Sequence, residues 1–155
     1  MLGRREFALL GTAATTAMVL QNVSIGQDKP KPGGAVSEGH HGAAMEKCAE
    51  ACGKCQRECD SCSTHCAQQL QAGKKDHAAT LASCQDCADL CAAAARILAR
   101  NGPYAEHVCK ACADACAACA AECMKFPKDA HMKACAEECR KCEKACREML
   151  EHVAK

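Results

Sequence analysis

Residues 48–66 read CAEACGKCQRECDSCSTHC and place six cysteines at successive steps of 4, 3, 4, 3 and 4. This alternation is the heptad spacing that aligns side chains along one stripe of an α-helix. The stripe that faces a helical core normally holds Leu, Ile or Val, whereas every position of this one is a thiol. The stretch therefore predicts a helix with one face of sulfur, and we call such a stripe a cysteine seam.

The first cysteine seam predicts a helix over about residues 45–71, which stops near Gly73. A second, shorter seam predicts a helix over about residues 75–100. The Asn101-Gly102-Pro103 break ends that helix, with Gly expected just past one helix and Pro in the first turn of the next.

Two further seams follow the break. Five cysteines between Cys109 and Cys123 predict a third helix, which the Phe126-Pro127 pair closes. Four cysteines between Cys135 and Cys146 predict a fourth. Four helices joined by short connections must run antiparallel to their neighbours. The predicted fold is therefore all-α, an antiparallel up-down four-helix bundle whose core is lined by cysteine.

Three segments are expected along the chain. Residues 1–26 contain Arg4-Arg5 followed by a short apolar run and resemble a twin-arginine signal peptide, which predicts export to the periplasm. Residues 27–44 are rich in Pro, Gly and charge and are predicted to form a flexible linker. Residues 45–155 are predicted to form the metal-binding bundle.

Composition narrows the class of function. The net charge is +1 and only three residues are aromatic, so the basic stripe and stacking platforms of a nucleic-acid-binding protein are missing. The apolar run near the start is too short to span a bilayer, so no stable membrane insertion is expected after signal removal. His65 and Cys66 are adjacent and point to different helix faces, which leaves no nucleophile–base pair. A binding protein is predicted, not an enzyme.

The seam spacing favours copper(I) as the bound ion. Cysteines three or four residues apart have Cβ atoms about 5 to 6 Å apart, so two sulfurs reach one metal by rotamer choice. Two-coordinate thiolate binding suits copper(I), whereas zinc prefers four ligands in a tetrahedron. Facing helices would supply further ligands, and many ions would then run along the bundle.

Other interpretations of the 18 cysteines remain open from the residues alone. Zinc or another soft metal would use the same thiols, and with terminal tetrahedral ligation would saturate at about 4 to 5 ions. A disulfide-bonded structural bundle is the usual expectation for an exported, cysteine-rich chain. Iron–sulfur ligation, a disulfide-exchange enzyme and cysteine as a mere small hydrophobe fit the regular spacing less well.

The repeated CxxxC and CxxC steps across four helices, behind a twin-arginine motif, resemble the exported branch of the bacterial copper storage proteins. The resemblance covers about residues 45–155 and implies a homotetramer that holds many copper(I) ions, supplies copper enzymes and limits copper toxicity. It also implies that the ligands are Cys48, Cys52, Cys55, Cys59, Cys62, Cys66, Cys84, Cys87, Cys91, Cys109, Cys112, Cys116, Cys119, Cys123, Cys135, Cys139, Cys142 and Cys146.

One end of the predicted bundle collects methionine and histidine side chains. Met45 extends the first seam by three residues and Met149 extends the fourth, while His41 precedes the first helix. Thioether and imidazole groups bind copper(I) more weakly than thiolate does. His41, Met45 and Met149 are therefore the predicted point at which copper enters and leaves, although methionine also serves as ordinary filler at a bundle end.

Overall fold

The computed structural model describes residues 40–153 of the chain, and at His40, His41 and Val153 only the backbone. The predicted signal peptide and most of the predicted linker lie outside this range. The described part comprises the helices α1 (His40–Gln71), η1 (Lys75–His77, a short 3₁₀ turn), α2 (Ala78–Ala99), α3 (Ala105–Cys123) and α4 (Ala130–Val153).

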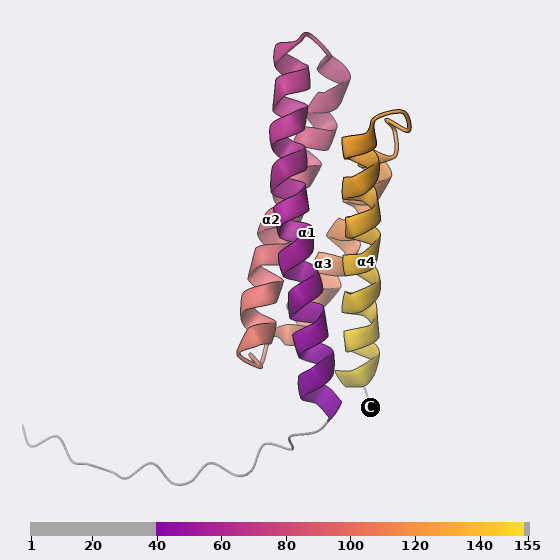
Figure 1. The fold of residues 1–155 in the computed structure, drawn as a ribbon. Coiled ribbons are helices and arrows are strands. Elements are labelled where there is room, and N and C mark those ends of the chain that lie inside the picture. Colours follow the sequence, from indigo (N-terminus) through magenta and orange to yellow (C-terminus); the bar gives the residue numbers. More distant parts are fainter. Residues whose placement is uncertain (1–39, 154–155) are drawn as a thin grey trace, which may run out of the picture. The chain divides into compact units, whose positions relative to one another are not determined.

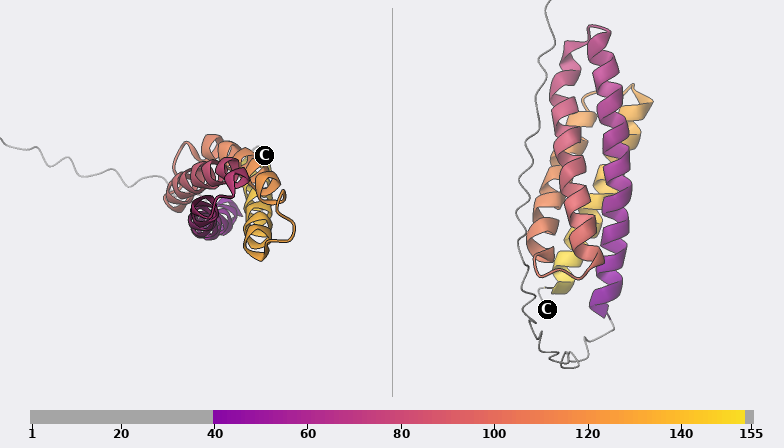
Figure 2. Two further views of the ribbon diagram at one scale, coloured as in Figure 1. Left: turned by 90° about the horizontal axis from the view of Figure 1, so that it is seen from above. Right: turned by 90° about the vertical axis from the view of Figure 1, so that its left-hand side faces the viewer.

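The four α-helices form the predicted antiparallel bundle (Figure 1). Around the bundle the order is α1, α2, α3, α4, and each helix packs on the two beside it. Viewed along the axis, the helices enclose one common core (Figure 2). Within residues 40–153, diagonally opposite helices make no close backbone contact, so only side chains meet across the centre.

The first turn of the bundle follows the glycine signal in the sequence. Gly73 has a φ of +86°, the left-handed conformation that glycine adopts without a steric penalty. Its amide donates to the carbonyl of Leu70 at 2.9 Å, and the amide of Lys74 donates to Gln69 at 3.0 Å. These two bonds satisfy the last carbonyls of α1 and end it at Gln71.

The second turn differs in detail from the prediction. Asn101, not Gly102, takes the left-handed conformation, with a φ of +49°. Gly102 is needed for space instead, because a Cβ there would lie 3.0 Å from the Ile97 side chain and 3.2 Å from its carbonyl oxygen. Helix α3 begins at Ala105, so Pro103 precedes the helix and does not occupy its first turn.

Two other boundaries also differ from expectation. Helix α1 begins at His40, so residues 40–44, expected in the linker, are helical. The predicted start of the second helix is a separate 3₁₀ turn, and α2 proper begins at Ala78. None of the helices within residues 40–153 is long and apolar enough to cross a membrane.

Candidate metal centre

All 18 cysteines are buried in the core of the bundle. Seventeen are fully inaccessible and Cys87 is 1% exposed. The other fully enclosed side chains include Leu98, Met132 and Met149, together with several alanines. The 3.5-residue period of each seam is what turns every thiol to the axis, as the sequence predicted.

The closest sulfur neighbours lie on different helices. Cys48 donates a hydrogen bond to Cys146 on α4 at 3.5 Å, and Cys91 on α2 lies 3.6 Å from Cys112 on α3. Of the Sγ–Sγ contacts up to 4.0 Å, the one within a single helix joins Cys55 and Cys59, at 3.9 Å. The sequence emphasised pairs along one helix, whereas the rotamers in this structure bring sulfurs together across the core.

These contacts assemble overlapping groups of four thiols. In each group all Sγ atoms lie within 4.8 Å of one another. Five of the groups are Cys52/Cys112/Cys142/Cys146, Cys55/Cys91/Cys116/Cys142, Cys55/Cys59/Cys87/Cys139, Cys59/Cys119/Cys135/Cys139 and Cys62/Cys84/Cys123/Cys135. Each group shares at least one cysteine with the next, so the sulfurs form one continuous column along the bundle axis.

The thiols of this column are free. No disulfide joins any of the 18 cysteines, all of which lie within the described helices. Their Sγ contacts of 3.5 to 4.0 Å are far longer than the disulfide bond length of about 2.05 Å. The cysteines are therefore arranged as free thiols that can bind metal, and not as a disulfide-bonded scaffold.

Burial keeps the thiol of Cys66, at one end of the column, neutral in the absence of a cation. At Cys66 it raises the thiol pKa to about 12, and the neighbouring Cys62 adds to the effect. Deeper in the core, hydrogen bonds from Cys123 and other thiols lower the pKa of Cys119. Hydrogen bonds involving Cys119 in turn raise the pKa of Cys139. Neighbouring thiols therefore do not ionise together unless a bound cation offsets the charge, and metal uptake must release protons.

One end of the column, which we call the Met149 end, lies where α1 and α3 begin and α2 and α4 end. Met149 is 1% exposed and Met45 is partly buried against the core. A hollow of about 250 Å³ is lined there by Ala43, Ala44, Lys47, Ala145, Glu148, Met149 and His152. Lys47 and Glu148 form an ion pair of 3.0 Å beside it. The side chain of His41 is outside the described atoms.

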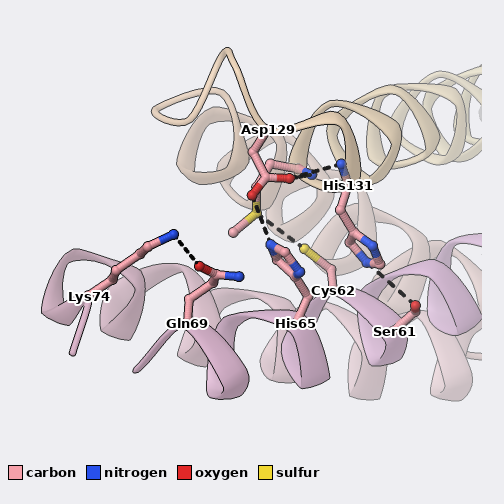
Figure 3. Close-up of polar contacts among 8 residues, drawn as sticks. Ser61, Cys62, His65, Gln69, Lys74, Asp129 and His131 are labelled. Atoms are coloured by element: carbon pink, nitrogen blue, oxygen red, sulfur yellow. Dashed lines mark hydrogen bonds and ion pairs between the residues drawn. The ribbon is translucent and has the colours of Figure 1, made fainter. Parts of the chain in front are cut away.

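The opposite end, which we call the Met132 end, is capped by imidazoles (Figure 3). Cys62 donates a hydrogen bond to the thioether sulfur of Met132 at 3.5 Å, which extends the sulfur column by one atom. The rings of His65 and His131 are stacked with centroids 4.7 Å apart. His77 is buried and stacks on Phe126 at 4.1 Å.

Asp129 organises this end and was not anticipated from the sequence. Its Oδ1 accepts hydrogen bonds from the backbone amides of His131 and Met132 at 2.9 and 3.3 Å, which caps the start of α4. Its Oδ2 lies 2.8 Å from Nε2 of His65 on α1. Partial burial acts to raise the pKa of Asp129, but these hydrogen bonds outweigh it and lower the pKa. This contribution to stability is present at neutral pH and is lost as the pH falls through the lowered pKa.

Comparison with known sequences decides the family. A family model described as copper storage protein matches residues 41–151, which is most of the chain. This chain belongs to the copper storage protein family. No curated protein sequence is similar enough to add a further relative.

Solved structures of the copper storage family share the fold. A cytosolic copper storage protein from Streptomyces lividans, described with five coppers, is 36% identical, covers 72% of this chain and 95% of its own, and gives a TM-score of 0.66. Apo copper storage protein 3 from Bacillus subtilis is 35% identical over 68% of this chain and 97% of its own, with a TM-score of 0.60. The Cu(I)-bound copper storage protein BsCsp3 is 34% identical over 69% and 98%, with a TM-score of 0.63.

Proposed function

We propose that this protein stores copper(I) on the thiolates of its 18 core cysteines, buffers free copper and supplies it to copper enzymes. The observation that carries the proposal is the continuous column of overlapping four-thiol groups. Membership of the copper storage family supports it, as do relatives described as copper-loaded and Cu(I)-bound. The proposed ligands are the same 18 cysteines that the sequence singled out.

The charge and geometry of the column suit copper(I). One copper(I) ion with one thiolate is neutral, so a fully loaded core carries no net charge that burial would penalise. Soft thiolate ligands favour this ion. A sulfur shared between neighbouring groups, such as Cys142 or Cys59, is placed to bridge two ions. Bridging lets the number of ions approach the number of thiols.

The direct test is anaerobic titration of the reduced protein with copper(I) against a competing chelator, followed by metal analysis. We expect tight binding that approaches roughly one ion per thiol, because two-coordinate and bridging sulfurs need few ligands per ion. Saturation at a few ions, or thiols that are already oxidised after anaerobic purification, would reject storage in favour of a zinc site or a disulfide scaffold.

We propose that binding is the whole activity and that no reaction is catalysed. The family is one of storage proteins. His65, the imidazole next to a cysteine in sequence, lies 2.8 Å from the carboxylate of Asp129 and serves the contact between α1 and α4. The 18 thiols are enclosed, whereas a thiol–disulfide exchange enzyme needs an exposed, activated cysteine.

We also propose that copper enters and leaves at the Met149 end, through His41, Met45 and Met149. Met149 supports this because it lies both in the core and on the wall of the 250 Å³ hollow, and so links solvent to the first thiols. A weak thioether ligand at this point would pass copper on to Cys146, three residues earlier on the same seam.

The double substitution Met45→Leu/Met149→Leu is expected to slow copper loading several-fold and to leave the final capacity unchanged. The reason is that leucine keeps the volume and removes the sulfur. The matched control is Met132→Leu, which removes the buried thioether at the other end. Stopped-flow loading from a copper(I)–chelator complex measures both. If the control slows loading and the double variant does not, copper enters at the Met132 end instead.

The proposed location is the periplasm, reached through the twin-arginine signal at residues 1–26. The family also includes a cytosolic member, the Streptomyces lividans protein, so location varies within it. The proposed assembly is a homotetramer, as the family resemblance implies. Cell fractionation of the full chain and light scattering of the mature protein check these two points.

A further inference from the structure

The four-thiol groups have the dimensions of a tetrahedral metal site before any metal binds. A zinc–thiolate tetrahedron with bonds of about 2.3 Å places its sulfurs about 3.8 Å apart. In the group of Cys52, Cys112, Cys142 and Cys146, Cys52 lies 3.9, 3.7 and 3.7 Å from the other three sulfurs in that order. Cys112 lies 4.0 Å from Cys142. Four of the six sulfur–sulfur distances in this set are thus within about 0.2 Å of the tetrahedral value, and the other two are at most 4.8 Å.

We propose that the bundle also binds divalent d10 ions, zinc and cadmium, each in a tetrahedron of four thiolates, and that it holds three such ions. Each ion replaces four protons: M²⁺ and four thiols give a tetrathiolate complex of charge −2 and four H⁺, with no change of oxidation state. The inference uses the same thiols as the copper store but stands on the spacing of the sulfurs, and it does not depend on copper binding.

The number three follows from the overlaps among the five groups named above. A mononuclear tetrahedral site uses each thiolate once, so two groups that share a sulfur cannot both be filled. Three groups share no sulfur with one another: Cys52/Cys112/Cys142/Cys146, Cys55/Cys59/Cys87/Cys139 and Cys62/Cys84/Cys123/Cys135. The count of cysteines alone suggested 4 to 5 ions (18/4), but the geometry strands six thiols outside these three groups.

The thiols outside the three groups help to stabilise the negative charge of the filled sites. Cys116 belongs to none of the three groups, and its Sγ lies 3.8 Å from Cys55 and 3.7 Å from Cys87. Its single S–H is therefore placed to donate a hydrogen bond to either of two sulfurs of the middle site. Each filled site still leaves a charge of −2 in the core, whereas copper(I) leaves none. Copper(I) is therefore expected to displace the divalent ions.

Two cysteines of α2 give a matched pair of variants. Cys87 and Cys91 are one helical turn apart, both are buried, and each lies 3.7 Å from Cys116. Cys87 is a member of the middle group, and no alternative choice among the five groups gives three separate sites without it. Cys91 belongs to a group that already overlaps two of the three, so its loss leaves all three intact.

The test is anaerobic titration of the reduced protein with Cd²⁺ alone, with a chelator to fix the stoichiometry and ¹¹³Cd NMR to count ions with four sulfur ligands. We expect three in the wild type, two in Cys87→Ser and three in Cys91→Ser. Circular dichroism before titration establishes that both variants are folded, and addition of copper(I) should release all the cadmium.

Equal cadmium losses in the two variants, or a wild type that binds no tetrahedral cadmium, would overturn the inference. Copper capacity separates this result from the proposed function, because each variant lacks one thiol and both should lose copper alike. A failed cadmium count with intact copper capacity rejects the tetrahedral sites and keeps the store. The reverse result, three cadmium ions with little copper, rejects the store and keeps the tetrahedral sites.

Discussion

The copper-loaded bundle is expected to unfold at a temperature tens of degrees above that of the metal-free protein. A ligand that binds the folded state alone, at 1,000 times its dissociation constant, stabilises it by about 4.1 kcal/mol. Many ions act together here. Each links thiols that only the fold brings close. Cys52 of α1 and Cys112 of α3 are an example, with sulfurs 3.9 Å apart although the residues are 60 positions apart in the sequence.

The unfolded chain retains part of this affinity. Its CxxC and CxxxC pairs still offer two thiolates to one copper(I), and binding to the unfolded state reduces the stabilisation. Calorimetry of apo, half-loaded and fully loaded protein therefore measures the share of binding that needs contacts between helices. Stripping the copper with a strong chelator should return the apo transition. Equal unfolding temperatures for the apo and loaded forms would mean that copper sits on local pairs and not in the assembled core.

The sequence was sufficient to predict the helices because each seam repeats strictly every 3.5 residues. A seam fixes which face of its helix is buried, so the burial of every cysteine followed from spacing alone. The glycine at position 73 marked the end of α1 for a local reason, its positive φ. Local chemistry of this kind is written in the sequence, and these predictions were confirmed.

Contacts between helices were harder to predict from the sequence. Which sulfurs meet depends on the rotation and stagger of four helices, and the seam spacing is the same whichever partner a helix faces. The overlapping groups, and with them the proposed number of tetrahedral sites, could therefore not be read from a count of cysteines. The structure is needed to show that Cys142 belongs to two groups while Cys87 belongs to one among the five.

His65 is a second example of a contact that the sequence did not predict. In sequence it stands beside Cys66 and was considered only as a partner for that thiol. In the structure it lies 2.8 Å from Asp129, 64 residues further on, in the connection between α3 and α4. A signal was present, because an Asp directly before a helix is a favoured N-cap residue, and Asp129 directly precedes Ala130, the first residue of α4. The pairing of that cap with α1 depends on tertiary packing.

The column is uneven at its two ends because α2 contributes only three cysteines. Towards the Met149 end its buried positions are Ala94 and Leu98, so sulfur there comes from α1, α3 and α4 alone. The copper sites proposed near this end consequently have fewer thiols to share. Leu98 occupies a buried position of α2 where a thiol could have stood, and it contributes packing there. Its contribution to stability should be measurable in the metal-free protein.

Substitution of Leu98 by alanine is expected to destabilise the apo bundle by about 2 to 5 kcal/mol, the usual range for a buried leucine. Leu98 is 1% exposed and is among the largest fully buried side chains of a core otherwise built from cysteine, alanine and methionine. A core with so few long side chains has little that could move into the gap. A small domain with a total stability of about 5 to 15 kcal/mol would lose a large fraction of it.

Denaturant unfolding of the reduced apo protein measures this loss. The matched control is Leu90→Ala on the same helix, where the side chain is partly exposed on the outer surface between α2 and α3 and should cost about 1 kcal/mol or less. Copper capacity should be unchanged in both variants, since neither residue carries sulfur, and loading should restore most of the stability lost in Leu98→Ala. Equal destabilisation by the two substitutions would contradict the view that Leu98 supplies packing that the thiol core lacks.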